Sequence, residues 1–297
     1  MKSRAQVLIV GKGAFGEAIA ELLYESHIFP KFYDKNPETQ PDYDNLQQAI
    51  IENDIIFFAV PSKSLPDIFE SIREIPMGER ISVLLSKGFS RLGTSAESFE
   101  HFFVGEPYAV LSGPMLAHNI RSGLFAGATL SSKQKDVRSV IAELFVHAHI
   151  IMEENSYPRS TALMGALKNI FAFGAGIIHE RAWGENILGI YLTQSLREMG
   201  TILSLKGYPS TPILGYAGLG DFIATINSTH SCNFGAGKAV ATMSEVNTCE
   251  SIDSFPHLEK HLHGYTKETL PITFALLSIS KGKDLDILLK AIRFGSK

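Results

Sequence analysis

A short apolar run near the start of the chain leads directly into a glycine-rich turn and then into an amphipathic segment. Gln6-Val-Leu-Ile-Val10 predicts a buried strand, Gly11-Lys-Gly-Ala-Phe-Gly16 the turn, and residues 17–26 a helix. In this order Gly11 permits a tight turn, Gly13 lets the backbone approach a phosphate, and Gly16 lets the helix pack closely on the strand. Because the positive end of the helix faces the turn, the arrangement favours the pyrophosphate of a dinucleotide. The expected cradle comprises Gly11, Gly13, Ala14, Phe15 and Gly16.

The first half of the chain alternates short apolar runs with amphipathic segments, which is the pattern of a parallel sheet with crossover helices. We expect strands at residues 6–10, 31–34, 54–60, 81–85, 108–111, 127–130 and 150–152. From about residue 158 long helical segments dominate, at 161–180, 186–206, 234–244 and 271–280. The sequence therefore predicts an α/β protein: a Rossmann-type doubly wound sheet in residues 1–155, followed by an all-α substrate domain in residues 156–297.

The second expected strand ends at Asp34, and Lys35 follows it at once. A carboxylate at this place in a dinucleotide-binding fold bonds the adenosine ribose hydroxyls and repels a 2′-phosphate, which favours NAD. The neighbouring Lys35 would instead attract that phosphate, and a plain polar turn is the alternative interpretation of both residues. The sequence predicts NAD or NADP as the cofactor, with NAD slightly favoured.

Lys168 lies in the middle of the apolar stretch 161–178. A helix that is apolar nearly all round must be buried, and a buried ammonium loses its hydration. Burial lowers the pKa of a lysine and suits it to proton transfer near neutral pH. The alternative is a lysine whose stem packs in the core while its charged end reaches solvent.

The bulk composition excludes several classes of protein. The chain has 297 residues, 45% of them hydrophobic and 20% charged, as in an ordinary soluble globular protein. A net charge of −4 gives no electrostatic reason to expect nucleic acid or an anionic membrane as a partner. The Lys-Asn pair and the glycines within 161–178 argue against membrane insertion. The two cysteines form no disulfide framework or metal-ligand pattern, so we expect a cytoplasmic protein without a metal site.

Six motifs, of which the glycine turn is the first, occur in an order that identifies a resemblance. They are Gly11-x-Gly-x-Phe-Gly-x-Ala, Val60-Pro-Ser62, Ser86-Lys-Gly88, Leu111-Ser-Gly-Pro114, Leu167-Lys-Asn169 and Gly218-Leu-Gly-Asp221. The chain resembles the NAD(P)-dependent glycerol-3-phosphate dehydrogenases from Val7 to about Ile272. The resemblance implies a Rossmann-type domain with a helical substrate domain, and interconversion of dihydroxyacetone phosphate and sn-glycerol 3-phosphate for phospholipid synthesis. It also implies a homodimer.

The resemblance assigns roles to individual residues. Lys168 matches the family's proton acceptor, and Lys87 matches a lysine that contacts both substrate and cofactor. Asp221 and Thr225, four residues apart on one helical face, complete the implied catalytic group. The positions that match substrate contacts are Lys87, Gly113, Lys168, Asn169, Asp221, Ser231 and Asn233. The implied cofactor contacts are the glycine cradle, Asp34, Lys35, Lys87 and Ala117.

Each of these residues also has a structural interpretation. Lys87 is a surface lysine at a strand end by its sequence alone, although the carboxyl end of a sheet strand is where open α/β sheets bind ligands. Asp221 is equally suited to cap a helix. The Asn169 amide and the Thr225 hydroxyl have local backbone groups as alternative partners.

Three positions depart from the family's pattern. Met115 stands where a serine or threonine hydroxyl contacts substrate, and Cys232 stands where an arginine meets phosphate. A thiol cannot replace the bidentate hydrogen bonds of a guanidinium. His263-Gly264 stands where Glu-Gly is usual near the cofactor, and a helix's worth of residues is missing before Pro271. His230, Lys206 and Lys238 are candidates for the missing charge. Two alternatives follow: a dehydrogenase of another small hydroxy substrate, or a catalytically weak cofactor-binding homologue.

Overall fold

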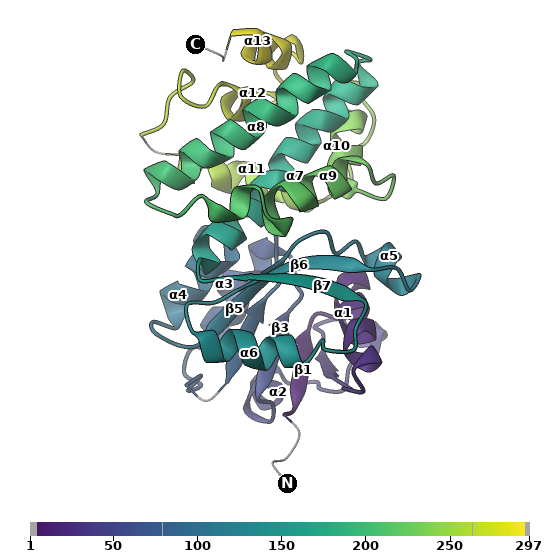
Figure 1. Cartoon of the computed structure of the whole chain (residues 1–297), viewed down its shortest axis with the longest axis vertical. Helices are drawn as coiled ribbons and strands as arrows, with labels where there is room; N and C mark the ends of the chain where they lie inside the picture. The colour runs from purple at the N-terminus through teal and green to yellow at the C-terminus, as the bar shows by residue number, and fades with distance from the viewer. Residues whose placement is uncertain (1–4, 79, 263, 295–297) are drawn as a thin grey trace.

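The computed structural model describes residues 5–78, 80–262 and 264–294. A seven-stranded sheet with helices on both faces forms the N-terminal half, and helices alone form the C-terminal half (Figure 1). The strands lie in the order β2-β1-β3-β4-β5-β6-β7. Their bounds are β1 Val7–Val10, β2 Lys31–Tyr33, β3 Ile55–Phe58, β4 Ile81–Leu84, β5 Tyr108–Ser112, β6 Ala126–Ser131 and β7 Ile150–Asn155. The Rossmann-type fold class predicted from the sequence is confirmed.

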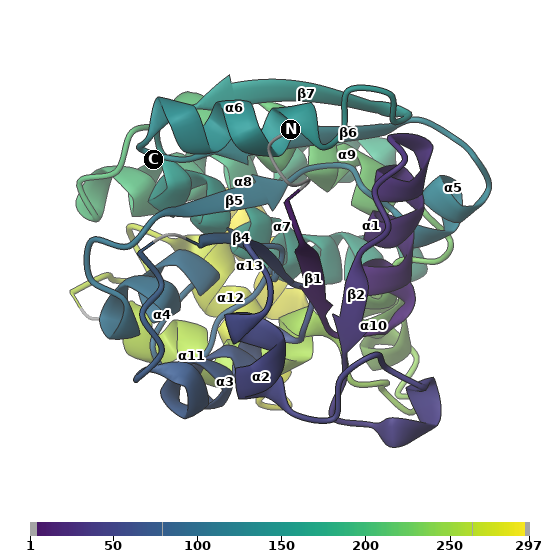
Figure 2. The same ribbon diagram turned by 90° about the horizontal axis from the view of Figure 1, so that it is seen from below.

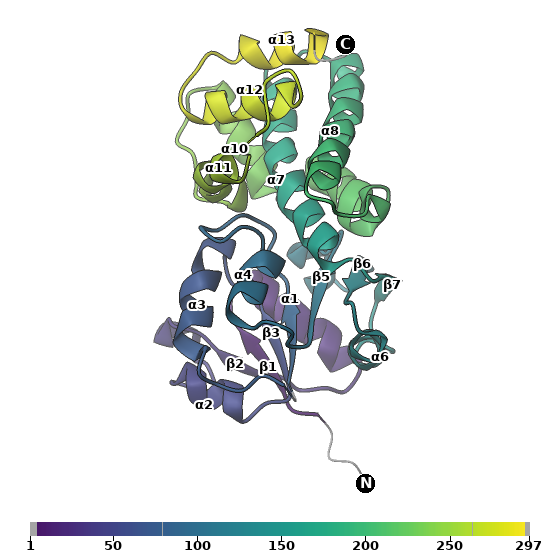
Figure 3. The same cartoon turned by 90° about the vertical axis from the view of Figure 1, so that its left-hand side faces the viewer.

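Strands β1 and β3 are apolar at every position because both faces of the sheet are covered. Along β1, Val7 and Ile9 point into one core and Leu8 and Val10 into the other. The first core is closed by α1 (Ala14–Glu25), α5 (Ala117–Arg121) and α6 (Lys135–Glu143), and the second by α2 (Leu46–Ile51), α3 (Leu65–Ile72) and α4 (Ser95–Phe102). Figure 3 shows α2 and α3 on one side of the sheet and α6 on the other, and Figure 2 shows the sheet from below.

The alternation of strands and helices predicts a parallel sheet, but one strand pair is antiparallel. Strand β6 runs antiparallel to β5, with Leu111 opposite Leu130, and then pairs in parallel with β7. The connection from β5 to β6 contains only the one-and-a-half-turn helix α5, so the chain returns alongside β5 rather than crossing over the sheet. The short helices α2 to α6 were also not located by the sequence pattern.

The helical half is built around α7 (Pro158–Glu180), which begins beside the sheet and runs up into the helical domain (Figure 1). Its partners are α8 (Glu185–Leu205), α9 (Asp221–Ile226), α10 (Cys232–Ala241), α11 (Glu250–His261), α12 (Pro271–Ser280) and α13 (Asp286–Phe294). Helix α10 packs most closely: a Cβ on Gly237 would lie 1.9 Å from the Phe173 carbonyl oxygen, and one on Gly176 2.1 Å from that of Phe234. The glycines let these two backbones touch.

Two expectations from the sequence concern the apolar helix α7 and the segment that follows α11. Helix α7 is long and apolar enough to cross a membrane, but its most apolar 18-residue window is entirely buried inside the protein. The family resemblance implied that a helix is missing between Tyr265 and Pro271. Residues 266–270 form no helix in the structure, and α11 ends before them at His261.

Candidate active site

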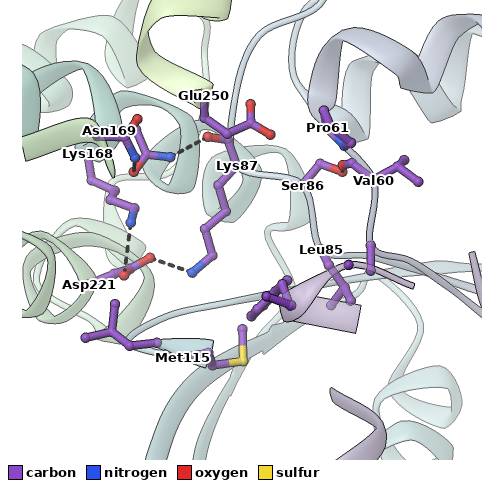
Figure 4. A pocket seen from close by; sticks show the side chains of 16 residues that line it. Val60, Pro61, Leu85, Ser86, Lys87, Met115, Lys168, Asn169, Asp221 and Glu250 are labelled. Carbon is purple, nitrogen blue, oxygen red and sulfur yellow. Dashed lines mark hydrogen bonds and ion pairs between the residues drawn. The ribbon is translucent and has the colours of Figure 1, made fainter. Parts of the chain in front are cut away.

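A cavity of about 420 Å³ lies between the carboxyl ends of the sheet strands and the helical domain (Figure 4). Both halves of the chain contribute to its walls. Its lining comprises Gly13, Ala14, Phe15, Ala59, Val60, Pro61, Leu85, Ser86, Lys87, Met115, Leu116, Lys168, Asn169, Asp221, Asn233 and Glu250. The position agrees with the rule that open α/β sheets bind ligands beyond the carboxyl ends of their strands.

Lys168 is buried in this wall with two polar partners. Its Nζ donates a hydrogen bond to Thr225 Oγ1 at 2.8 Å and lies 3.2 Å from Asp221 Oδ1. The lysine is 5% exposed and Asp221 1%. A short π-helical segment, Tyr216–Gly220, leads directly into α9 and delivers Asp221 and Thr225 from one helical face. The charged end of Lys168 therefore does not reach solvent, and the alternative of a lysine with only its stem in the core is wrong.

Burial lowers the pKa of Lys168 from 10.5 to about 8, against the opposing effect of the Asp221 carboxylate. The nearby Lys87 ammonium lowers the pKa further. An amine with this pKa exists in appreciable amounts in both protonation states near neutral pH, which is the condition for general acid–base catalysis.

Lys87 faces the same carboxylate from the opposite domain. Its Nζ lies 2.7 Å from Asp221 Oδ2 and donates to the Gly113 carbonyl oxygen at 2.6 Å. Asp221 thus accepts from both lysines (Figure 4), and its side chain serves the cavity rather than capping α9. Gly113, at φ +154°, is needed because a Cβ there would lie 2.6 Å from the Gly127 carbonyl oxygen.

A chain of amides connects Lys87 to the helical domain. Asn169 Nδ2 donates to the Lys87 carbonyl oxygen at 2.7 Å, and Asn233 Nδ2 donates to Asn169 Oδ1 at 2.8 Å. Asn233 Oδ1 in turn accepts from the Ser251 backbone N–H at 2.9 Å. These bonds fix the two asparagine side chains in the cavity wall.

The glycine turn has the geometry of a phosphate cradle. Gly11 adopts φ +105°, and a Cβ there would lie 2.5 Å from the Ala59 carbonyl oxygen. A Cβ on Gly16 would meet the Gly11 carbonyl oxygen at 2.0 Å, whereas one on Gly13 would have no atom within 4 Å. Gly13 is the N-terminal cap of α1, so open space lies directly over the positive end of this helix.

A second cavity, of about 520 Å³, adjoins the first and shares Gly13, Ala59, Val60 and Pro61 with it. It extends to Tyr33, Asp34 and Lys35 at the end of β2. Two connected cavities on either side of the glycine turn fit the two halves of a dinucleotide. Asp34 already accepts backbone hydrogen bonds from Lys12 at 2.7 Å and Asn36 at 2.8 Å, which hold the turn in place.

Glu250 is the charged residue of the cavity lining that the sequence reasoning missed. It begins α11, its Oε1 accepts from the Ser62 backbone N–H at 3.0 Å, and burial raises its pKa. Gly88 lies beside it, and a Cβ there would lie 2.0 Å from Glu250 Oε2. The family resemblance implies that His263 replaces an acidic residue near the cofactor. His263 lies outside the described residues. Glu250 places a carboxylate in the cavity.

The structure places several predicted residues away from the lining. Ser231 caps α10 by accepting from the Phe234 backbone N–H at 3.2 Å, and among the described residues it is not part of the cavity wall. Ala117 begins α5, one residue beyond the wall. Lys206 pairs with Glu97 at 2.9 Å and Lys238 with Glu180 at 3.3 Å, so neither supplies a free charge to the cavity.

Comparison with known proteins agrees with this geometry. The N-terminal profile of the NAD-dependent glycerol-3-phosphate dehydrogenases matches residues 33–138, and the C-terminal profile of the same family matches residues 158–286. The chain belongs to this family. The glycerol-3-phosphate dehydrogenase [NAD(P)+] of Acinetobacter baumannii is 29% identical over 316 residues, covering 94% of this chain and 86% of that protein. That of Synechococcus elongatus is 29% identical over 244 residues, covering 81% and 78%.

The fold of the family is shared as well. The crystal structure of glycerol-3-phosphate dehydrogenase from Coxiella burnetii superposes with a TM-score of 0.87, covers 98% of both chains and is 21% identical. As a member of the family, the chain is an NAD(P)-dependent oxidoreductase of the CH–OH class.

Proposed function

We propose that the protein is an NAD(P)-dependent glycerol-3-phosphate dehydrogenase that interconverts dihydroxyacetone phosphate and sn-glycerol 3-phosphate. The observation that carries the proposal is the buried Lys168–Asp221–Lys87 group, which faces a dinucleotide cradle across one cavity. Matches to both domains of the family support it.

Lys168 is the proposed proton donor and acceptor. When bound, the reduced nicotinamide supplies a hydride to C2 of the ketone. Lys168 Nζ gives a proton to the oxygen on C2 during reduction, and its neutral amine takes that proton back during oxidation. With a pKa of about 8, Lys168 is mostly the ammonium at pH 7, which is the form that can give a proton during reduction.

Asp221 and Lys87 have supporting roles in this proposal. Asp221 holds both ammonium groups and keeps the pKa of Lys168 from falling further. Lys87 presents a second positive charge to the substrate oxygens from the opposite wall. Thr225 orients Lys168 because its Oγ1 accepts a hydrogen bond from Lys168 Nζ at 2.8 Å, and Asn169 and Asn233 offer amides to the substrate hydroxyl groups.

The dinucleotide would lie along the glycine turn. Gly11, Gly13, Ala14, Phe15 and Gly16 would hold the pyrophosphate, while Asp34 and Lys35 would face the adenosine ribose. The cofactor is NAD or NADP, and we propose a slight preference for NAD. We further propose residues 1–155 as the cofactor domain and 156–297 as the substrate domain, a cytoplasmic location without membrane insertion, and a homodimer, which sedimentation would test.

A steady-state assay tests the proposal. Purified protein is mixed with dihydroxyacetone phosphate and either NADH or NADPH, and loss of absorbance at the nicotinamide band is followed. Turnover with at least one cofactor is expected. No turnover with either would contradict the activity; turnover of another hydroxy compound would then favour the alternative dehydrogenase that Met115 and Cys232 suggest.

A further inference from the structure

A phosphorylated substrate needs positive charge or hydrogen-bond donors around its phosphate, and the cavity wall offers few. The cations that line it are Lys87 and Lys168, and both are ion-paired with Asp221. Met115 is apolar, and Cys232 turns its thiol to the Thr248 carbonyl oxygen at 3.6 Å. Burial and the neighbouring Cys249 raise the pKa of the Cys232 thiol to about 11, so it stays neutral.

Two histidines, one from each half of the chain, contact each other through their rings, and both are close in sequence to residues that line the cavity. The imidazole rings of His118 and His230 lie 4.2 Å apart between centroids, with 44° between their planes. His118 belongs to α5 in the sheet domain, two residues after the lining residue Leu116. His230 belongs to the loop between α9 and α10 in the helical domain, three residues before the lining residue Asn233. In Figure 1 α5 lies below α9 on the same side of the molecule.

The two rings have ring nitrogens available for a ligand. Within residues 5–78, 80–262 and 264–294, no side-chain hydrogen bond or ion pair engages either imidazole. The other cation of α5, Arg121, turns away to Glu17 and Glu21 of α1, at 3.6 and 3.7 Å. Two imidazoles this close repel each other when both are protonated, and an anion that bridges them removes that repulsion.

We propose that His118 and His230 bind the phosphate group of the substrate, one from each domain, and so act as specificity-determining residues. This rests on the proposed function, since it assigns the phosphate end of the same substrate. Imidazole N–H groups donate to phosphate oxygens, and protonated rings add charge to these bonds. Because the two rings come from different domains, a phosphomonoester bound by both would also connect the domains.

The experiment compares wild type with His118→Gln, His230→Gln and the double variant. Glutamine keeps a polar side chain of similar length but cannot carry the charge. We expect the KM for dihydroxyacetone phosphate to rise roughly tenfold to hundredfold in the double variant, because charge-assisted bonds are lost. The KM for the reduced nicotinamide should stay within twofold and kcat within threefold. His147→Gln is the matched control, because His147 is exposed and lines neither cavity, and it should change neither KM.

Inorganic phosphate gives an independent measurement. It should inhibit wild type competitively against dihydroxyacetone phosphate and inhibit the double variant at least tenfold more weakly. An active wild type whose double variant keeps both its KM and its phosphate inhibition within twofold would overturn the proposal and leave the proposed function standing. Equal rises in the KM for both substrates would also overturn it, since they would indicate a general disturbance. A wild type inactive on dihydroxyacetone phosphate would overturn both proposals.

Discussion

Lys168 and Asp221 lie 3.2 Å apart, Nζ to Oδ1, although 53 residues separate them in the chain and both are almost completely buried. Buried ion pairs are costly to desolvate, and an apolar replacement is often at least as stable. This pair is surrounded by the apolar wall of α7, which structure alone does not require to carry a charge. The pair therefore has to be explained by what it does in the cavity.

The pH dependence of the reaction should follow Lys168. Reduction needs the ammonium, so its kcat/KM should fall as pH rises above about 8; oxidation needs the neutral amine and should rise through the same range. Rates measured from pH 6 to 10 in both directions test this. Asp221→Asn removes a cause that raises the pKa, so both transitions should move to lower pH. If kcat/KM for reduction and kcat/KM for oxidation did not change in opposite directions with pH, Lys168 would not be the titrating group.

Thr225→Val should lower kcat by tenfold or more. The methyl group cannot accept the hydrogen bond from Lys168 Nζ, and a buried N–H that loses its acceptor costs about 1–3 kcal/mol. Thr225→Ser keeps the hydroxyl and serves as the control, with kcat within threefold of wild type. Steady-state kinetics should find the KM for the nicotinamide cofactor unchanged. Equal activity of the valine and serine variants would show that the hydrogen bond is dispensable.

Gly13→Ala should weaken cofactor binding without unfolding the protein. A Cβ at this position meets no protein atom within 4 Å, but it would occupy the space over the N-terminus of α1. Fluorescence titration with NADH and NADPH should show at least a tenfold weaker affinity. Gly189→Ala in α8 is the control, because its Cβ also meets nothing within 4 Å. Unchanged affinity in the first variant would mean that the dinucleotide does not pass over Gly13.

Lys168→Met should change how stability depends on pH. The unfolded chain keeps a proton on Lys168 up to about pH 10.5, but the folded protein only to about 8, so wild-type stability should rise with pH between these values. Below pH 8 the shift costs wild type roughly 3 kcal/mol, which the variant avoids. Urea unfolding at pH 7 and pH 10 measures both proteins. The advantage of the variant at pH 7 should shrink at pH 10; a constant difference would contradict the shifted pKa.

The sequence was most informative where a residue conflicted with its surroundings. A lysine inside an apolar helix and a glycine turn after a buried strand each have few structural explanations, and the structure places both at one cavity. The fold class followed from the alternation of strands and helices. Contacts between distant segments could not be predicted in this way. Asp221 pairs with Lys87 across 134 residues, and the sequence around either residue does not indicate that the other is its partner.

The remaining differences have similar causes. Glu250 follows a cysteine in an irregular polar segment, so neither periodicity nor a turn signal marked it as a cavity residue. The antiparallel β6 depends on the short α5 connection, which is only five residues long and lacks a clear apolar period. Ser231 was assigned to the substrate by the family resemblance alone, whereas its hydroxyl accepts the Phe234 backbone N–H as the cap of α10.

The most direct test of the account is the effect of Lys168→Ala on turnover of dihydroxyacetone phosphate. With the nicotinamide that wild type uses, kcat should fall by about 10²–10⁴-fold, the usual contribution of a positioned acid or base. Cofactor affinity, measured by fluorescence titration of the same sample, should stay within threefold and thereby confirm a folded protein. A variant that reduces dihydroxyacetone phosphate at a rate comparable to wild type would contradict the central claim that Lys168 transfers the proton.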